Sequence, residues 1–373
     1  MIMEINDILS RYDSQPDDDN QLSLAAQRER SRAVARRERR EQADQIRAEL
    51  HAQDSRDLNS LLEQSRAKSM ETMLNMPQVK GYERGGTLLV QLSDLHFGAV
   101  TRRESKPHYC LATAAKRLRL YAQKVIELAL IKDTRKLVVA LTGDMVESRM
   151  GKMMPDKMVG YEGSQMYAAA VGAHLVGMFI NEVRSSNLFS QIRIHGCPGN
   201  EARLTKDISF EDSLLSENLD CRLNEHLHNI FHGLPGVELQ FKDRAMIIEV
   251  EQVKVLMIHG HTLKGQLSQK MIGETLAQYG ADYGISGHIH YPYACADWAR
   301  SGSLVGEDNY AADGLTLRGG NASQTVIHFQ GTRRDPTFID LDDPGDIEGY
   351  EIPTFSGAYG VVEFQPLQMQ TAA

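Results

Sequence analysis

The stretch TLLVQLSDLHFG, residues 87–98, decides the fold and marks the place where the chemistry begins. Its first half is mostly apolar without strict alternation, which is typical of a strand buried on both faces in an α/β protein. Asp94, His96 and Gly98 follow directly. Side chains two residues apart on an extended backbone point the same way, so a carboxylate and an imidazole placed like this can bind one metal ion.

The same arrangement, a polar group directly after an apolar strand, occurs at four further places. These are Gly143-Asp144, Gly199-Asn200-Glu201, His259-Gly260-His261 and Gly287-His288-Ile289-His290. Loops at the carboxyl ends of strands are where α/β proteins build their sites, and glycines let the backbone approach an ion or a phosphate. We therefore predict one shared site with these metal ligands: Asp94, His96, Asp144, Asn200, His259, His288 and His290.

Each segment by itself has an ordinary explanation, because Gly-Asp is common in turns and His259-Gly260-His261 also fits a turn with hydrogen-bonded core histidines. All five in this order favour the metal site. The donors are imidazole, carboxylate and amide groups without a thiolate, which fits two divalent ions per chain, with Mn²⁺ preferred over Mg²⁺, Fe²⁺ or Zn²⁺. Two ions about 3.5–4 Å apart would clamp a phosphate and activate a hydroxide for in-line attack.

The remaining sequence alternates helices with strands. Helices are predicted over residues 108–130 and 165–185, a hairpin over 245–260, and a helix followed by a short strand over 276–290. The tail is rich in strands, which we place at residues 325–329, 337–342 and 360–364. Two sheets packed face to face with helices outside would give an α/β/β/α sandwich.

The N-terminal region differs in composition from the rest of the chain. A loose polar arm, residues 1–20, precedes a long predicted helix over residues 21–75 that contains neither Gly nor Pro. Residues 28–47 carry eight arginines against four acids, and an apolar stripe follows at 46–74. We rank homodimerisation or packing back on the catalytic domain first, and DNA contact second. Docking of an ATPase partner is a further alternative.

These features predict three parts: an N-terminal region over residues 1–76, a catalytic domain over 87–345 and a tail over 346–373. The net charge of −9 argues against simple coating of nucleic acid by bulk charge, although it permits a nuclease. We find no run of about 18 uncharged apolar residues and no signal peptide, and four scattered cysteines indicate reduced thiols. We therefore expect a cytoplasmic protein without a membrane span.

With these motifs in this order, residues 87–330 resemble the calcineurin-like metallophosphoesterase family, whose pattern is Asp-x-His, Gly-Asp, Gly-Asn-His, His and Gly-His-x-His. The resemblance implies a four-layer α/β/β/α sandwich with two central metals. Asp144 would bridge them. The first metal would be held by Asp94, His96 and His290, and the second by Asn200, His259 and His288.

Within the family the sequence is most similar to phage and prophage phosphoesterases, and through them to DNA-repair exonucleases. That similarity implies a phosphodiesterase that cleaves DNA, in a bacterial or phage-infected cell. A phosphatase acting on phosphoproteins or small phosphoesters is the alternative, and a catalytically weakened metal-binding scaffold is a second one.

One position departs from the family pattern, because Glu201 stands where the family usually has histidine after Gly-Asn. An anion beside a phosphate is repulsive, so Glu201 is either protonated as a general acid, paired with a neighbour such as Arg203, or a cause of reduced activity. Arg203 and His261 are the candidate substrate-binding residues. For both, a purely structural role is the competing explanation.

Overall fold

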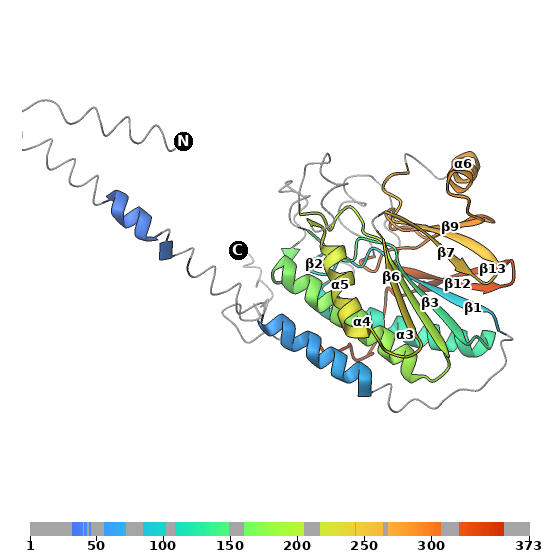
Figure 1. The fold of residues 1–373 in the computed structure, drawn as a ribbon, viewed down its shortest axis with the longest axis horizontal. Coiled ribbons are helices and arrows are strands. Elements are labelled where there is room, and N and C mark those ends of the chain that lie inside the picture. Colours follow the sequence, from blue (N-terminus) through green and yellow to red (C-terminus); the bar gives the residue numbers. More distant parts are fainter. Residues whose placement is uncertain are drawn as a thin grey trace, which may run out of the picture. The chain divides into compact units, whose positions relative to one another are not determined.

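The computed structural model divides the chain into two compact units, Met1–Arg56 and Asp57–Ala373 (Figure 1). In the first unit residues 32–39 are helical and exposed. The expected strand at 360–364 and the arm at 1–20 lie outside the described residues. The structure describes residues 32–39, 41–42, 45, 56–71, 85–101, 109–148, 160–204, 217–242, 244–263, 268–306 and 321–353.

The larger sheet of the second unit has the strand order β13-β12-β1-β3-β5-β6. Four neighbouring strands of this sheet are parallel: β1 (Thr87–Leu92), β3 (Lys136–Leu141), β5 (Gln191–Gly196) and β6 (Val237–Phe241). The edge beyond β1 is antiparallel and consists of β12 (Ser323–Gln330) and β13 (Arg333–Asp340). Parallel neighbours bring the carboxyl ends of β1, β3 and β5 to the same edge, where the motifs begin.

The smaller sheet has the order β10-β11-β9-β8-β7. The predicted hairpin is confirmed, because β7 (Ala245–Val250) and β8 (Val253–Ile258) pair antiparallel around Glu251. The other strands are β9 (Tyr283–Ser286), β10 (Tyr293–Ala294) and β11 (Trp298–Arg300). Since β8 and β9 are parallel, their carboxyl ends also share one edge. A separate two-stranded pair is formed by β2 (Ala99–Val100) and β4 (Gly160–Tyr161).

Four helices pack on the sheets. Leu88 and Val90 of β1 belong to a core shared with α3 (Leu111–Lys132), α4 (Gln165–Ser185) and α5 (Leu219–Phe231). The alternate residue Leu89 packs instead against Met257 and Ile285 of the smaller sheet. A third core joins Leu256 and Trp298 to α6 (Gln269–Tyr279), on the other face of that sheet. The mixed α/β class predicted from the sequence is confirmed.

Helix α4 is long and apolar enough to span a membrane by composition, yet 72% of that stretch is buried inside the protein. Core packing therefore accounts for its apolar character.

Residues 57–71 form a helix that packs on α4 and α5. Leu61 is buried, the Ser65 Oγ lies 3.0 Å from His174 Nδ1 of α4, and Arg66 donates to the Asn229 carbonyl of α5 at 2.7 Å. This compact unit begins at Asp57, and the boundary near residue 76 stays a prediction.

Candidate metal centre

The loops after β1, β3, β8 and β9 are tied together by backbone hydrogen bonds. Asp94 N–H donates to the Gly143 carbonyl at 3.0 Å, and Gly287 N–H donates to the His259 carbonyl at 2.8 Å. The candidate ligands Asp94, His96, Asp144, His288 and His290 all have left-handed φ angles between 47° and 74°. Such angles are costly for residues with a side chain and concentrate at functional sites. The motif loops are therefore held in conformations that local preference alone would not select.

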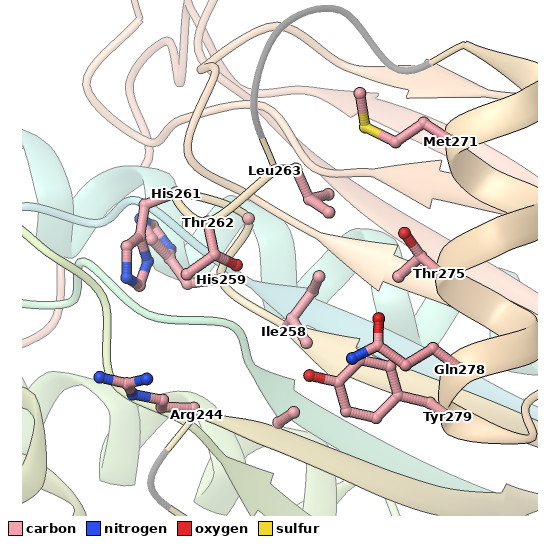
Figure 2. A pocket seen from close by; sticks show the side chains of 12 residues that line it. Arg244, Ile258, His259, His261, Thr262, Leu263, Met271, Thr275, Gln278 and Tyr279 are labelled. Carbon is pink, nitrogen blue, oxygen red and sulfur yellow. The ribbon is translucent and has the colours of Figure 1, made fainter. Parts of the chain in front are cut away.

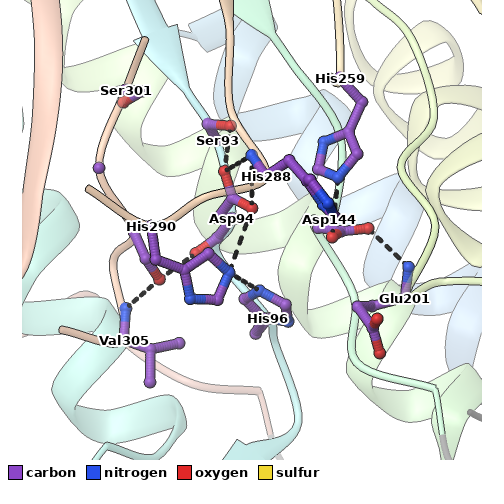
Figure 3. A network of polar contacts seen from close by, with 12 residues as sticks. Ser93, Asp94, His96, Asp144, Glu201, His259, His288, His290, Ser301 and Val305 are labelled. Atoms are coloured by element: carbon purple, nitrogen blue, oxygen red, sulfur yellow. Dashed lines mark hydrogen bonds and ion pairs between the residues drawn. The ribbon is translucent and has the colours of Figure 1, made fainter. Parts of the chain in front are cut away.

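The first ligand group consists of Asp94, His96 and His290, whose ligand atoms lie within 4.8 Å of one another. His96 Nε2 and His290 Nε2 are 3.1 Å apart, and His290 Nε2 lies 3.3 Å from Asp94 Oδ1 (Figure 3). Two imidazole nitrogens directed at each other beside a buried carboxylate form the donor set of a cation site.

The second ligand group consists of Asp144, His259 and His288, again with ligand atoms within 4.8 Å. His259 Nε2 lies 2.9 Å from Asp144 Oδ2 and 3.1 Å from the amide oxygen of Asn200. Asn200 therefore lies beside this group. The negative charge of Asp144 raises the pKa of His96 in the first ligand group as well as that of His259 in the second.

Neighbouring acceptors fix the orientation of two imidazoles. His96 Nδ1 lies 2.6 Å from Glu147 Oε2, and His259 Nδ1 lies 2.8 Å from the Thr142 carbonyl. With Nδ1–H donating in each ring, Nε2 faces the ligand group. Outer hydrogen bonds of this kind set the tautomer of metal-binding histidines and increase their basicity. Glu147 is 2% exposed and was not singled out from the sequence, although it lies three residues after Asp144.

Asp220, at the start of α5, connects the loops that carry Asp144 and Asn200. Its Oδ2 accepts from the backbone N–H groups of Asp144 and Gly199, both at 2.8 Å. Its Oδ1 accepts from the next two N–H groups of the Asp144 loop at 2.9 and 3.1 Å. The carboxyl group is fully buried. Burial, and then the charge of Asp144, raise its pKa to about 7, while the four backbone donors favour the ionised form. The sequence analysis missed this residue because no local motif surrounds it.

Close packing leaves no room for side chains at two motif glycines. A Cβ at Gly199 would lie 2.1 Å from Asp144 Oδ1, and one at Gly287 would lie 2.3 Å from Asp94 Oδ2. Both distances are far below van der Waals contact. These glycines therefore allow neighbouring loops to approach the ligand carboxylates.

The electrostatics of the two groups favour cations. Burial lowers the pKa of His96, but the hydrogen bond and charge of Glu147 outweigh it and raise that pKa to about 9. Burial opposes the charge of Asp144 in the same way at His259, whose pKa also rises to about 9. The pKa of Asp144 stays far below its usual value, because the positive field of His259 overcomes burial. Divalent ions would take the place of these protons.

Glu201, Arg203 and His261 lie close to the second ligand group. The Glu201 carboxylate accepts from the Asn200 amide at 2.8 Å, while its backbone N–H donates to Asp144 Oδ1 at 2.7 Å. Burial, and then the charges of His259 and Arg203, lower the pKa of His261 to about 3. His261 is therefore neutral near pH 7 and, like Arg203, is half-buried.

No protein-family model and no curated protein match the chain. Zinc-bound Vps29 from Entamoeba histolytica aligns at 11% identity over 68% of this chain and 99% of its own, with a TM-score of 0.32. A predicted phosphoesterase from Streptococcus pneumoniae aligns at 11% over 70% and 92%, with a TM-score of 0.30. The calcineurin-like phosphoesterase YfkN from Bacillus subtilis aligns at 10% over 69% and 91%, with a TM-score of 0.29. With values this low, these likenesses decide neither fold nor activity.

Proposed function

We propose that the protein is a metal-dependent phosphodiesterase of the calcineurin-like type that hydrolyses DNA. The observation that carries the proposal is that two groups of histidine and aspartate side chains, the first with Asp94 and the second with Asp144, lie at one edge of the fold. The donor set of imidazole, carboxylate and amide fits divalent Mn²⁺, Fe²⁺, Zn²⁺ or Mg²⁺, and we propose Mn²⁺.

The candidate ligands form two sets, one for each proposed ion. Asp94, His96 and His290 would hold one ion, while the groups around Asp144 would hold the other. Bound divalent ions supply Lewis acidity toward phosphoryl oxygens and lower the pKa of water. Glu147 and the Thr142 carbonyl keep two imidazoles turned toward the ions, so the protein reorganises little when they bind.

Glu201 favours a diester over a monoester. A phosphomonoester carries a charge of about −1.5 to −2 near pH 7, whereas each phosphate of DNA carries one negative charge. Glu201 lies next to Asn200 and is held there by its amide. Repulsion by this carboxylate therefore disfavours the more highly charged monoester. Arg203, on the same loop, supplies a planar cation that can bind a phosphate of the DNA backbone.

The test compares two chromogenic substrates with DNA. Protein stripped of metal is reloaded with Mn²⁺ and assayed with bis-p-nitrophenyl phosphate, p-nitrophenyl phosphate, and linear duplex or single-stranded DNA. We expect metal-dependent hydrolysis of the diester and of DNA, with the monoester much slower. Glu201→Gln should raise the monoester rate relative to the diester rate.

Two matched variants distinguish loss of the metal centre from the general effect of replacing a buried or hydrogen-bonded aspartate. Asp144→Asn should abolish both activities, whereas Asp282→Asn should not, because Asp282 binds the Lys254 N–H at the opposite end of β8. A folded protein that cleaves the monoester but neither the diester nor DNA would refute the proposal in favour of a phosphatase.

A further inference from the structure

A cavity of about 460 Å³ opens beside the second ligand group (Figure 2). His259 and His261 form one wall, so the cavity borders the second ligand group at His259. The opposite wall is one face of α6. The full lining is Arg244, Ala245, Ile258, His259, Gly260, His261, Thr262, Leu263, Met271, Thr275, Gln278 and Tyr279.

Helix α6 presents two different faces. Ile272 and Leu276 are buried against Trp298 and hold the helix on the smaller sheet. The lining residues Met271, Thr275, Gln278 and Tyr279 follow at helical spacing on another face and point into the cavity (Figure 2). Core packing explains the first face only, so the second face is available for a ligand.

Several polar groups at this cavity have no hydrogen-bond partner among the residues that the structure describes. Within the described ranges, the side chains of Thr275, Gln278 and Tyr279 make no hydrogen bond. His261 Nδ1 is buried and likewise has no hydrogen-bond partner among the described residues. Buried polar atoms in proteins are nearly always paired, so a bound molecule or a water can supply the partner for His261.

We propose that this cavity binds the nucleobase of the nucleotide whose phosphate lies at the metal centre. The volume falls within the range of about 300–1,000 Å³ typical of small-ligand sites. Tyr279 offers a ring on which a base can stack, with Leu263 and Met271 as further apolar lining. The Gln278 amide both donates and accepts, so it can bind the edge of any base. This inference rests on the proposed function, because it needs a phosphate at the metals.

The experiment measures binding rather than catalysis. Calorimetry of the Mn²⁺-loaded full chain compares deoxyadenosine 5′-monophosphate with deoxyribose 5-phosphate, which has the same phosphate but no base. We expect the nucleotide to bind about tenfold more tightly, as one stacked base would provide. Tyr279→Ala should remove this advantage, and Tyr279→Phe should keep most of it.

Glu274→Ala is the matched control, because Glu274 is exposed on α6 and does not line the cavity. It should bind both compounds as the wild type does. Equal affinities in the wild type, or an advantage that persists in Tyr279→Ala, would overturn the inference. Hydrolysis of the diester without any base preference would refute this inference alone. A base preference without hydrolysis would refute the proposed function alone.

Discussion

Replacing Asp220 with asparagine tests how the second ligand group is positioned. Each carboxylate oxygen of Asp220 accepts two backbone N–H groups, from the loops that carry Asp144 and Asn200. Asparagine keeps one oxygen and turns an NH₂ group toward two donors. Two buried donors without acceptors cost about 1–3 kcal/mol each, so we expect the free energy of unfolding to fall by about 2–6 kcal/mol.

The same change should weaken metal binding beyond its effect on folding. Misplacing Asp144 and Asn200 should lower Mn²⁺ affinity about 10- to 100-fold, as loss of outer-shell support typically does. The assay combines urea unfolding of the metal-free protein with calorimetric titration of Mn²⁺ under conditions where each variant is fully folded.

Leu227→Ala is the matched control, because Leu227 is fully buried on the same helix. It should cost a comparable 2–5 kcal/mol or so through a cavity, yet leave Mn²⁺ affinity unchanged. If Asp220→Asn binds Mn²⁺ as tightly as the wild type, or if both variants lose affinity equally, Asp220 does not position the ligands.

Three further predictions concern other residues. Glu147→Gln should lower the pKa of His96 from about 9 and reduce Mn²⁺ affinity about tenfold. The pKa is followed by NMR titration of the metal-free protein, and an unchanged titration would contradict the prediction. Gly287→Ala should lose metal, because its methyl group would lie 2.3 Å from a ligand carboxylate oxygen; metal analysis that finds wild-type content would disprove the crowding. Burial, and secondarily Arg193, lowers the pKa of His195 to about 4. The unfolded chain therefore takes up the proton first as pH falls below about 6.5, and this site should lose about 2 kcal/mol of stability between pH 7 and pH 5. His195→Leu should reduce that loss in urea unfolding, and an identical pH dependence in both proteins would refute it.

The sequence was most informative where local pattern and tertiary role coincide. The run at residues 87–92 forms β1, and the motifs after five strands meet at one place because parallel strands share an edge. The spacing of Asp94 and His96 was interpreted as strand geometry, but both residues have left-handed φ angles. They meet through a loop that is held by backbone bonds to the Asp144 segment.

Other features depend on contacts that no local pattern records. Asp220 looks like an ordinary acid in an amphipathic helix, and its role arises only because α5 places it under two distant loops. Helix α5 and β6 were not predicted, although the residues of β6 alternate between apolar and polar as in a half-buried strand. The lining of the cavity likewise combines the end of β8 with one face of α6, segments that the sequence presents as unrelated.

The most direct test of the metal centre is crystallographic. Crystals of the full chain with Mn²⁺ should show two anomalous peaks about 3.5–4 Å apart. One peak should be bound by Asp94, His96 and His290, and the other by His259 and His288, with Asp144 contacting both. A single peak, or Mn²⁺ bound elsewhere on the protein, would contradict the account of a dinuclear centre.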